Sequence, residues 1–295
     1  MEQVPFDKRT GKIWFNNELV EWSNAKIHIL SHGLHYASFV FEGLRVYDQQ
    51  IFKLEDHTKR FFYSAKRMGL EIPYTEEEIN KACNKIVSVQ KIKNGYVRPS
   101  AWRGSEQMAV SAQKTKIHVA IATWEWGTYF DSKLLEKGIS LTISKLRRPN
   151  PNSVPWDTKA SGLYMICTLS KHEAEKNGFT DALMLDHEDN IAEATGANIF
   201  FISKTGELHT PIPDSFLDGI TRRCVIDIAN SKGIKVVERK IKIEEMNSFT
   251  GCFLTGTAAE ITPVSKIDNC NFKVCNTIKD LSKNYHAIVR KKNVT

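Results

Sequence analysis

Lys159 is the residue whose surroundings in the sequence most suggest a chemical role. It lies in the run PWDTKASGLYMI (residues 155–166), where Asp157 is the charged residue close by and small residues follow the lysine. A lysine that forms an imine must be partly desolvated, because the reacting species is the neutral amine. Small neighbours also leave room for a planar ring. On spacing alone a surface lysine is the simpler interpretation, so Lys159 is a candidate nucleophile at this point.

Two short segments have the composition of anion-binding turns. Asp218–Thr221 (DGIT) leads directly into a predicted helix, whose first amides would face outward at its positive end. Thr255–Ala259 (TGTAA) follows a predicted strand, and its small residues would let backbone amides approach an anion closely. Helices often start with Gly and Thr, so each segment alone is a weak signal. Both have the shape that a phosphate group requires.

Glu193 and the pair Tyr96 and Arg98 are further candidates. Glu193 lies among small residues between two apolar segments, where a carboxylate is either a satisfied structural group or a partner for a ring nitrogen. Tyr96 and Arg98 alternate along a predicted strand, so their side chains point to the same face. An arginine held on a rigid strand suits recognition of a carboxylate. A salt bridge at a strand edge is the alternative interpretation.

Three histidines have a spacing that could indicate a metal site. His28, His32 and His35 would share one face of a helix, as metal ligands do. Their segment is rich in β-branched and aromatic residues and contains Gly33, and the next acidic residue is Glu42. We therefore expect structural histidines and no bound metal.

The elements that must position these residues are strand pairs and helices. The Asn16–Asn17 pair predicts a hairpin turn within Lys12–Val20. Thr75 and Glu78 form a capping box that begins a helix reaching about Lys91. The hydrophobic pattern predicts further strands at 39–47, 50–54, 96–102, 117–124, 139–146, 182–186, 191–193, 198–203, 234–238 and 252–255, and further helices at 55–68, 161–177, 221–232 and 278–290. Without strict βαβ alternation, this mixture predicts an α+β fold.

Length and pattern together predict two lobes. At about 150 residues per domain, 295 residues suggest two domains. The pattern loosens after Gly127 and then becomes charged, which predicts a small N-terminal lobe at 1–130, a linker at 131–138 and a larger C-terminal lobe at 139–295. The sequence has neither the GxGxxG of a dinucleotide fold nor the GxxxxGK[ST] of a P-loop.

Composition excludes several classes of protein. Hydrophobic residues make up 41% and charged residues 25%, as in ordinary globular chains. No apolar run approaches the roughly 18 residues of a membrane span, and the first ten residues predict no signal peptide. Six cysteines without a CxxC pair predict reduced thiols and a cytoplasmic location. The net charge of +7 is scattered, so we expect no nucleic-acid partner and no membrane partner.

Taken together, these segments resemble the branched-chain amino acid aminotransferases, which belong to the fold type IV (D-amino acid aminotransferase-like) enzymes of pyridoxal 5′-phosphate (PLP). The likeness covers nearly the whole chain. Its segments are IWFNNELVEW (13–22), SHGLHYASFVFEGLRVY (31–47), YVRP (96–99), the Lys159 run, EATGANIF (193–200), LDGITR (217–222) and GTAAEITPVSKI (256–267). The resemblance implies a two-lobed α+β fold with PLP in the cleft between the small and the large lobe.

The resemblance also implies a set of cofactor-binding residues. Lys159 would form the internal aldimine with PLP and then move the proton of the reaction as base and acid. Glu193 would keep the pyridine nitrogen protonated, so that the ring acts as an electron sink. Tyr164 would donate to the phenolic oxygen of the ring. The remaining residues would hold the phosphate (Arg60, Ile220, Thr221 and Thr257) or cover the ring face (Gly196 and Leu217).

The substrate pocket follows from the same resemblance. The amides of Thr257 and Ala258 would receive the substrate α-carboxylate, and Tyr36 with Arg98 would receive the side-chain carboxylate of glutamate. The rest of the pocket would be apolar and aromatic, formed by Phe41, Tyr96, Trp126, Tyr129 and Tyr164, with Val110 supplied by a neighbouring subunit. The implied reaction moves the amino group of L-leucine, L-isoleucine or L-valine to 2-oxoglutarate, and the reverse, in at least a homodimer.

Two segments depart from the commonest family form. The usual EGxGEN is EATGAN at 193–198, and the usual PGIT is DGIT at 218–221. The groups assigned to PLP are retained, so the changes concern loop stiffness and fine specificity. Other fold type IV enzymes are the alternatives: D-amino acid aminotransferase, aminodeoxychorismate lyase and (R)-amine transaminases. The combination of FEGLR (41–45), YVRP and GTAAE favours the branched-chain group, and a non-catalytic relative would have lost Lys159.

Overall fold

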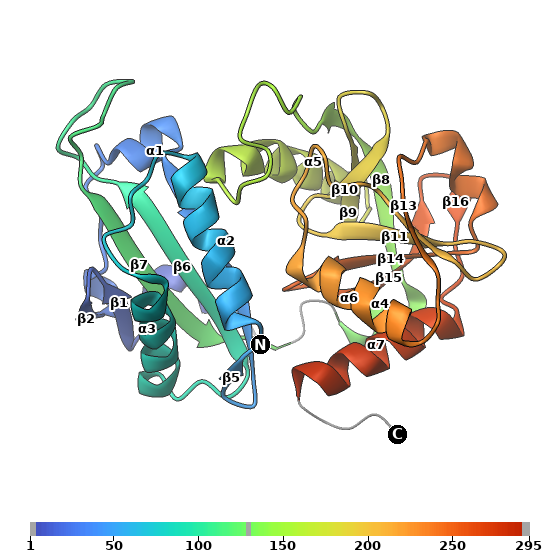
Figure 1. Cartoon of the computed structure of the whole chain (residues 1–295), viewed down its shortest axis with the longest axis horizontal. Coiled ribbons are helices and arrows are strands. Elements are labelled where there is room, and N and C mark those ends of the chain that lie inside the picture. Colours follow the sequence, from blue (N-terminus) through green and yellow to red (C-terminus); the bar gives the residue numbers. More distant parts are fainter. Residues whose placement is uncertain (1–3, 128–130, 291–295) are drawn as a thin grey trace. The chain divides into compact units, whose positions relative to one another are not determined.

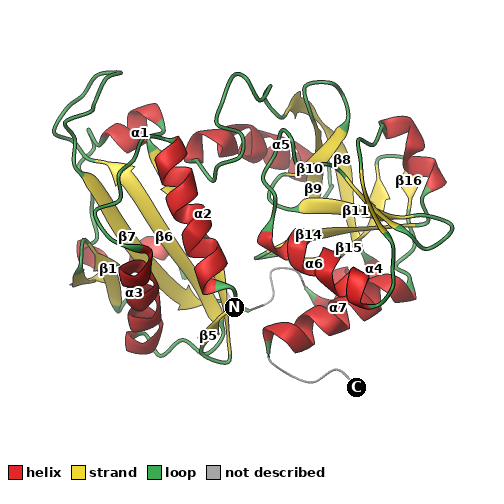
Figure 2. Ribbon diagram, viewed as in Figure 1, coloured by secondary structure: helices red, strands yellow, loops and turns green. Residues whose placement is uncertain are grey.

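The computed structural model describes residues 4–127 and 131–290, which form two compact units (Figure 1). The first unit comprises residues 4–127 and 158–162, and the second comprises residues 131–157 and 163–290. Each unit combines a sheet with helices (Figure 2). The predicted α+β class is therefore confirmed.

Within the described residues, the first unit is built on a seven-stranded sheet of order β2-β1-β7-β6-β4-β5, with β3 paired to β6. Asn16 and Asn17 have positive φ angles of 47° and 72°, the turn geometry that the predicted hairpin requires. Helices α2 and α3 pack on one another and on the sheet (Figure 1). The elements are β1 (Lys12–Phe15), β2 (Glu18–Glu21), α1 (His32–Tyr36), β3 (Phe39–Phe41), β4 (Leu44–Tyr47), β5 (Gln50–Ile51), α2 (Leu54–Arg67), α3 (Glu76–Val89), β6 (Gly95–Arg103) and β7 (Ile117–Glu125), with short 3₁₀ turns at Phe6–Lys8 and Trp22–Asn24.

The two long helices of the first unit, α2 and α3, differ in the polarity of the face that they bury. α3 starts at the predicted capping box, in which Glu78 N donates to Thr75 Oγ1 over 3.2 Å and Thr75 N donates to Glu78 Oε2 over 2.7 Å. Its buried face is apolar, as the periodicity predicts. The buried face of α2 carries the polar residues His57 and Ser64 beside Phe61. Polar groups buried on a helix need partners, and α2 finds them in the candidate site.

The second unit contains, among its described residues, a nine-stranded sheet of order β10-β9-β8-β15-β14-β11-β12-β13, with β16 paired to β15. Because β10 pairs with both β9 and β11, six of these strands close into a ring. The elements are α4 (Ser132–Lys137), β8 (Ile139–Arg147), α5 (Met165–Lys176), β9 (Asp181–Leu185), β10 (Ile191–Ala194), β11 (Asn198–Ile202), β12 (Leu208–Thr210), α6 (Ile220–Ser231), β13 (Val236–Glu238), β14 (Gly251–Gly256), β15 (Glu260–Ile267), β16 (Cys270–Asn271) and α7 (Asn276–Val289), with 3₁₀ turns at Ser161–Tyr164 and Ile243–Ser248.

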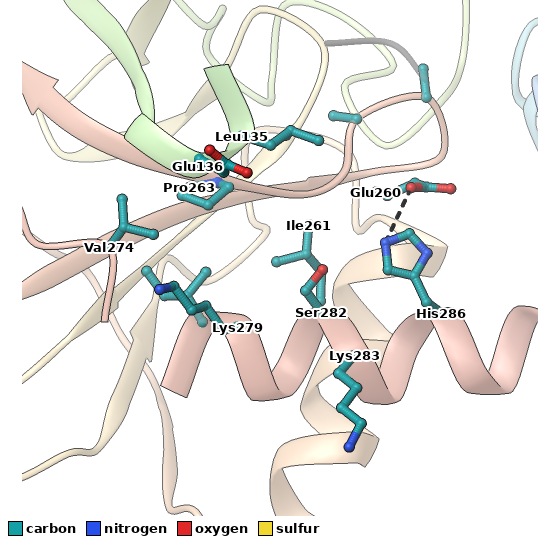
Figure 3. A pocket seen from close by; sticks show the side chains of 13 residues that line it. Leu135, Glu136, Glu260, Ile261, Pro263, Val274, Lys279, Ser282, Lys283 and His286 are labelled. Atoms are coloured by element: carbon teal, nitrogen blue, oxygen red, sulfur yellow. Dashed lines mark ion pairs between the residues drawn. The ribbon is translucent and has the colours of Figure 1, made fainter. Parts of the chain in front are cut away.

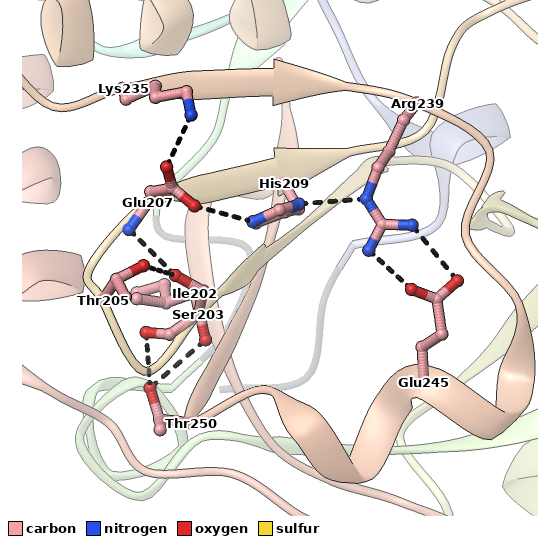
Figure 4. Close-up of polar contacts among 9 residues, drawn as sticks. All are labelled: Ile202, Ser203, Thr205, Glu207, His209, Lys235, Arg239, Glu245 and Thr250. Carbon is pink, nitrogen blue, oxygen red and sulfur yellow. Dashed lines mark hydrogen bonds and ion pairs between the residues drawn. The ribbon is translucent and has the colours of Figure 1, made fainter.

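A polar network fixes the edge of the second sheet at β12 and β13 (Figure 4). Arg239 donates from Nε to His209 Nδ1 over 3.1 Å and forms a two-point ion pair with Glu245. His209 in turn lies 3.6 Å from Glu207, which pairs with Lys235 over 2.7 Å. The network links the strand edge to the 3₁₀ turn that carries Glu245, so it stabilises this edge.

Several segments differ from the pattern-based expectation, among them the short elements α1, β12 and β16, which were not predicted. Most of the predicted linker 131–138 is helix α4, because Asp131 accepts a hydrogen bond from Lys133 N over 2.8 Å and caps it. The predicted helix 161–177 begins as a 3₁₀ turn and becomes α-helical at Met165. Strand β15 was not predicted; it pairs with β14 through Pro263 and with β8 from Val264, with a register shift between Val264 and Lys266.

Candidate active site

The Lys159 segment belongs to the first unit, whereas the sequence pattern placed it in the C-terminal lobe. Ala160 forms an antiparallel bridge with Val40, and Phe41 N donates to the carbonyl of Lys159 over 3.2 Å. On the other side, Lys159 N donates to Ser64 Oγ on α2 over 3.0 Å. The backbone of Lys159 is therefore held between β3 and α2, which fixes where its side chain starts.

The amine of Lys159 lies in aromatic and charged surroundings. Its Nζ is 4.7 Å from the centroid of the Phe41 ring. Burial lowers the pKa of Lys159 to about 8, helped by the positive charges of Arg60 and Arg98 and opposed by Glu42 and Tyr96. A neutral amine is therefore accessible near physiological pH, as an imine-forming lysine requires.

Arg98 and Tyr96 share one face of β6, as predicted from their alternation. The Arg98 guanidinium carbon lies 4.7 Å from the Phe41 ring and 5.4 Å from the Tyr96 ring. Its Nε is buried and has no hydrogen-bond partner in the described parts of the chain. A buried donor of this kind is suited to donate a hydrogen bond to a bound anion, such as a carboxylate. Tyr96 also packs edge-on against Trp126, with ring centroids 4.6 Å apart.

Gly43 explains how Tyr96 reaches this position. A Cβ built on Gly43 would lie 1.7 Å from the Tyr96 hydroxyl oxygen, so any larger residue would displace the ring. The glycine of the FEGLR segment therefore makes room for the tyrosine of YVRP. These two segments, far apart in the sequence, form one packed surface.

Glu42 and His57 are buried partners of Arg60 that sequence reasoning did not select. Glu42 accepts two hydrogen bonds from Arg60, at 2.6 Å from Nε and 3.0 Å from Nη2, and one from His57 Nδ1 at 2.7 Å. For His57, the signal that could have found it is the spacing of His57, Arg60 and Ser64, which places all three on one face of α2. Glu42 has no such signal.

Glu193 is the centre of the site residues in the second unit. It lies on β10 with a carboxylate that is 3.5 Å from Arg148 Nε and accepts from Asn198 Nδ2 over 3.3 Å. Arg148 is buried and comes from the turn-rich segment after β8, where no candidate was predicted. The carboxylate is thus held in place from two sides.

Asn198 links Glu193 to the start of α6. Its Nδ2 also donates to the carbonyl of Leu217 over 2.9 Å, and its Oδ1 accepts from Gly219 N over 3.1 Å. A Cβ on Gly219 would lie 2.2 Å from that Oδ1, so the close approach needs glycine. The amides of Ile220 and Thr221 then open α6 at its positive end, where first-turn amides lack acceptors within the helix.

The turn between β14 and β15 lies next to the Gly196 segment. A Cβ on Gly256 would lie 3.3 Å from Ala197 Cβ and 3.4 Å from the carbonyl of Gly196. Thr257 and Ala258 follow in this turn, and their binding of an anion stays a prediction. A Cβ added to Gly196 would meet nothing within 4 Å, so this segment has open space beside it.

A pocket of about 390 Å³ in the second unit borders the same turn. Ala258 and Ile261 line it together with Ser282 of α7 (Figure 3). Figure 3 shows His286 directed toward Glu260, and their side chains are 3.7 Å apart. When His286 is protonated, this pair ties α7 to the residue that follows the turn.

The remaining predicted residues have less defined surroundings. Tyr36 stacks on the His32 ring at 4.5 Å and is 43% exposed, and Val110 is 85% exposed. Tyr164 directly precedes α5, and Tyr129 lies outside the described residues. His32 bonds with Ser38 and the carbonyl of Ala109, a structural role.

Comparison with known proteins identifies the family to which this chain belongs. A model of the amino-transferase class IV family matches residues 39–267. The chain is 40% identical over 294 residues to the probable branched-chain-amino-acid aminotransferase of Rickettsia conorii, covering 98% of this chain and all of that one.

Two solved structures are similar over 97% of this chain and 96% of their own, each with 35% identity. One is the Thermoproteus uzoniensis branched-chain aminotransferase with norvaline (TM-score 0.92), and the other is the T.th. branched-chain amino acid aminotransferase with pyridoxamine 5′-phosphate (TM-score 0.93). The T.th. enzyme has also been solved with N-(5′-phosphopyridoxyl)-L-glutamate and with 4-methylvaleric acid.

The chain therefore belongs to the class IV aminotransferases, which use PLP. Within that family these relatives and solved structures are branched-chain aminotransferases, and the chain belongs with them. In the described residues, no helix is long and apolar enough to cross a membrane.

The residues described above fit PLP. Lys159 offers an amine of lowered pKa to the aldehyde, and Glu193 offers a held carboxylate to a protonated ring nitrogen. The start of α6 offers amides to a phosphate. No part of this donor set conflicts with the chemistry of the group.

Replacing Asn198 is expected to weaken cofactor retention. Asn198→Ala removes the side chain that fixes the Leu217–Gly219 turn and contacts Glu193. Losing buried hydrogen bonds costs about 1–3 kcal/mol, so we expect the Kd for PLP to rise about tenfold or more in a spectroscopic titration. Asn230→Ala, at an exposed position of α6, the helix that follows this turn, is the control. An unchanged Kd for Asn198→Ala would show that the turn does not depend on this side chain.

Proposed function

We propose that the protein transfers amino groups between L-leucine, L-isoleucine or L-valine and 2-oxoglutarate, with PLP bound through Lys159. The observation that carries this proposal is the Lys159 amine, which lies 4.7 Å from the Phe41 ring with its pKa lowered to about 8. An amine in this state can act as nucleophile, base and acid near neutral pH. When bound, PLP supplies the electron sink for the carbanion formed at the substrate Cα.

The side chains and amides of the protein would hold the cofactor and the substrate, and Lys159 would transfer the proton of the substrate Cα. Nζ of Lys159 would take the proton from the substrate Cα as base and release it again as acid. The Glu193 carboxylate would accept a hydrogen bond from the N–H of the pyridine ring, and Tyr164 would donate to the ring oxygen. Arg60, the start of α6 and Thr257 would bind the phosphate, while Leu217 and Gly196 would cover the ring face. The amides of Thr257 and Ala258 receive the substrate α-carboxylate.

The same pocket must accept an aliphatic and an acidic side chain. Phe41, Tyr96 and Trp126 offer an aromatic surface to the branched chain. Arg98, whose buried Nε lacks a partner in the described residues, offers its guanidinium to the second carboxylate of glutamate. The T.th. relative has been solved with both a glutamate adduct and 4-methylvaleric acid, which supports this division for the family.

The proposal extends to assembly and location. The resemblance puts Val110 against a neighbouring subunit, and its 85% exposure in one chain leaves it available for that contact. We therefore propose at least a homodimer. The six cysteines are all free thiols, which supports a cytoplasmic location.

The test is a half-reaction assay across a panel of amino acids. We expect the PLP-loaded protein to lose its cofactor absorbance band on addition of L-leucine, L-isoleucine, L-valine or L-glutamate, and to recover it with 2-oxoglutarate. D-alanine is the control, because it is a substrate for the alternative fold type IV activity. Turnover of D-alanine without turnover of L-leucine would overturn the substrate assignment.

A further inference from the structure

A buried charged cluster in the first unit is not accounted for by binding cofactor or substrate. At its centre is Glu42, which is fully buried. The carboxylate accepts from Arg60 Nε over 2.6 Å, from Arg60 Nη2 over 3.0 Å and from His57 Nδ1 over 2.7 Å. Gly43 N adds a fourth donor at 3.2 Å. Both oxygens of this carboxylate therefore accept hydrogen bonds.

The cluster keeps Glu42 ionised although it is buried. Burial alone would raise the pKa of Glu42, but the charge of Arg60 and the hydrogen bonds from both partners outweigh it and hold that pKa far below its usual range. Burial lowers the pKa of His57, so the imidazole is neutral at physiological pH and does not cancel the charge. Glu42 is a permanent anion in the interior.

The same cluster is connected to the backbone of Lys159. His57, Arg60 and Ser64 lie on one face of α2, and Ser64 Oγ accepts from Lys159 N. On the strand side, Phe41, the neighbour of Glu42, donates to the carbonyl of Lys159. A change at Glu42 therefore reaches Lys159 through two routes, the helix and the strand.

Stability alone is a weak explanation for such a cluster. Replacing a buried ion pair by apolar residues of similar volume is often neutral or stabilising. Nζ of Lys159 lies 4.7 Å from the centroid of the Phe41 ring, and Phe41 is the residue directly before Glu42. Among the charges that act on the pKa of Lys159 (Glu42, Arg60, Tyr96 and Arg98), that of Glu42 is the carboxylate. The negative charge of Glu42 raises the pKa of Lys159, whereas burial and the positive charges of Arg60 and Arg98 lower it.

We propose that Glu42 is a positioning residue that fixes the guanidinium of Arg60 by a two-point contact and places a permanent negative charge beside the amine of Lys159. The ligands that Arg60 and Lys159 bind are part of the proposed function, on which this inference rests to that extent. The contact between Glu42 and Arg60 and the charge of Glu42 are independent of it, so both can be tested on the chain without cofactor.

The first test measures how readily Lys159 reacts at each pH. The full-length chain, freed of cofactor, is treated with an amine-acylating reagent, and labelling of the Lys159 peptide is followed by mass spectrometry. We expect a midpoint near 8 for the unaltered chain. Glu42→Gln keeps the shape and removes the charge, so its midpoint should fall by about one unit and labelling at pH 7 should rise about fivefold.

A merely structural role would move this profile the other way. If Glu42→Gln loosened the fold, Lys159 would become hydrated and its midpoint would rise toward the ordinary lysine value of about 10.4. Glu55→Gln, at an exposed position on α2, is the matched control and should leave the profile unchanged. A midpoint for Glu42→Gln that stays near 8 or rises would overturn the proposal.

The second variant separates charge from position and serves if Glu42→Gln does not fold. Glu42→Asp keeps the anion but is one methylene shorter, so it cannot maintain both contacts to Arg60. We expect an unchanged midpoint for Lys159 and about tenfold faster loss of PLP from the loaded enzyme, since one charged hydrogen bond that fixes Arg60 is lost. Unchanged PLP loss, or a shifted midpoint, would contradict the two-part role. A chain that binds no PLP would refute the proposed function, and the labelling midpoint would still decide the role of the charge.

Discussion

Lys159→Ala is expected to reduce amino transfer from L-leucine by about 10³- to 10⁴-fold, because it removes the group that exchanges the proton at the substrate Cα. It also removes the covalent attachment of the cofactor. The fold should persist, since the backbone of residue 159 keeps its bonds to Phe41 and Ser64. Stopped-flow measurement of the half-reaction gives the rate, and circular dichroism checks the fold.

The control for this variant is a lysine that has no proposed role in the reaction. Lys59→Ala lies at an exposed position of α2 and should react at the unaltered rate. If Lys159→Ala, folded and supplied with PLP, kept more than about a tenth of the original rate, another residue would be the base.

Arg98→Met should separate the two substrate classes. The long apolar side chain preserves contact with Phe41 and Tyr96 but removes the guanidinium. A charged hydrogen bond to a carboxylate contributes about 1.5–3 kcal/mol, so kcat/KM for L-glutamate should fall about 10- to 100-fold. For L-leucine, which has no second carboxylate, we expect a change within about threefold. The measurement is kcat/KM for both half-reactions of one preparation.

Arg98→Lys provides the comparison of charge with geometry. It retains a positive charge without the planar fork of donors, so glutamate should be affected less than in Arg98→Met. Equal losses for glutamate and leucine in Arg98→Met would remove the assigned role, because packing and not carboxylate binding would then explain the effect.

The local parts of the structure were predictable from the sequence. The hairpin turn at Asn16 and the capping box at Thr75 depend on residues that are neighbours in the chain. The shared face of Tyr96 and Arg98 follows from the period of a strand. Lys159 as an imine-forming residue came from its ordered place among several motifs, which together are far more specific than each alone.

The parts that depend on tertiary contacts were not predictable. No pattern in the sequence shows that Glu42 meets His57 and Arg60, since their pairing requires β3, which Glu42 directly follows, to pack on α2. The same is true of Asn198, which closes on a turn about 20 residues later. Residues 158–162 join the first unit through a bridge to β3 that has no local signature.

The cofactor attachment itself is the most direct test of the central claim. The PLP-loaded protein is reduced with borohydride and digested, and its peptides are mapped by mass spectrometry, with and without prior addition of L-leucine. The account predicts one phosphopyridoxyl group on Lys159, in the peptide that contains residues 155–166, and its disappearance when L-leucine is added first. A modified lysine elsewhere, or no modified lysine at all, would contradict it.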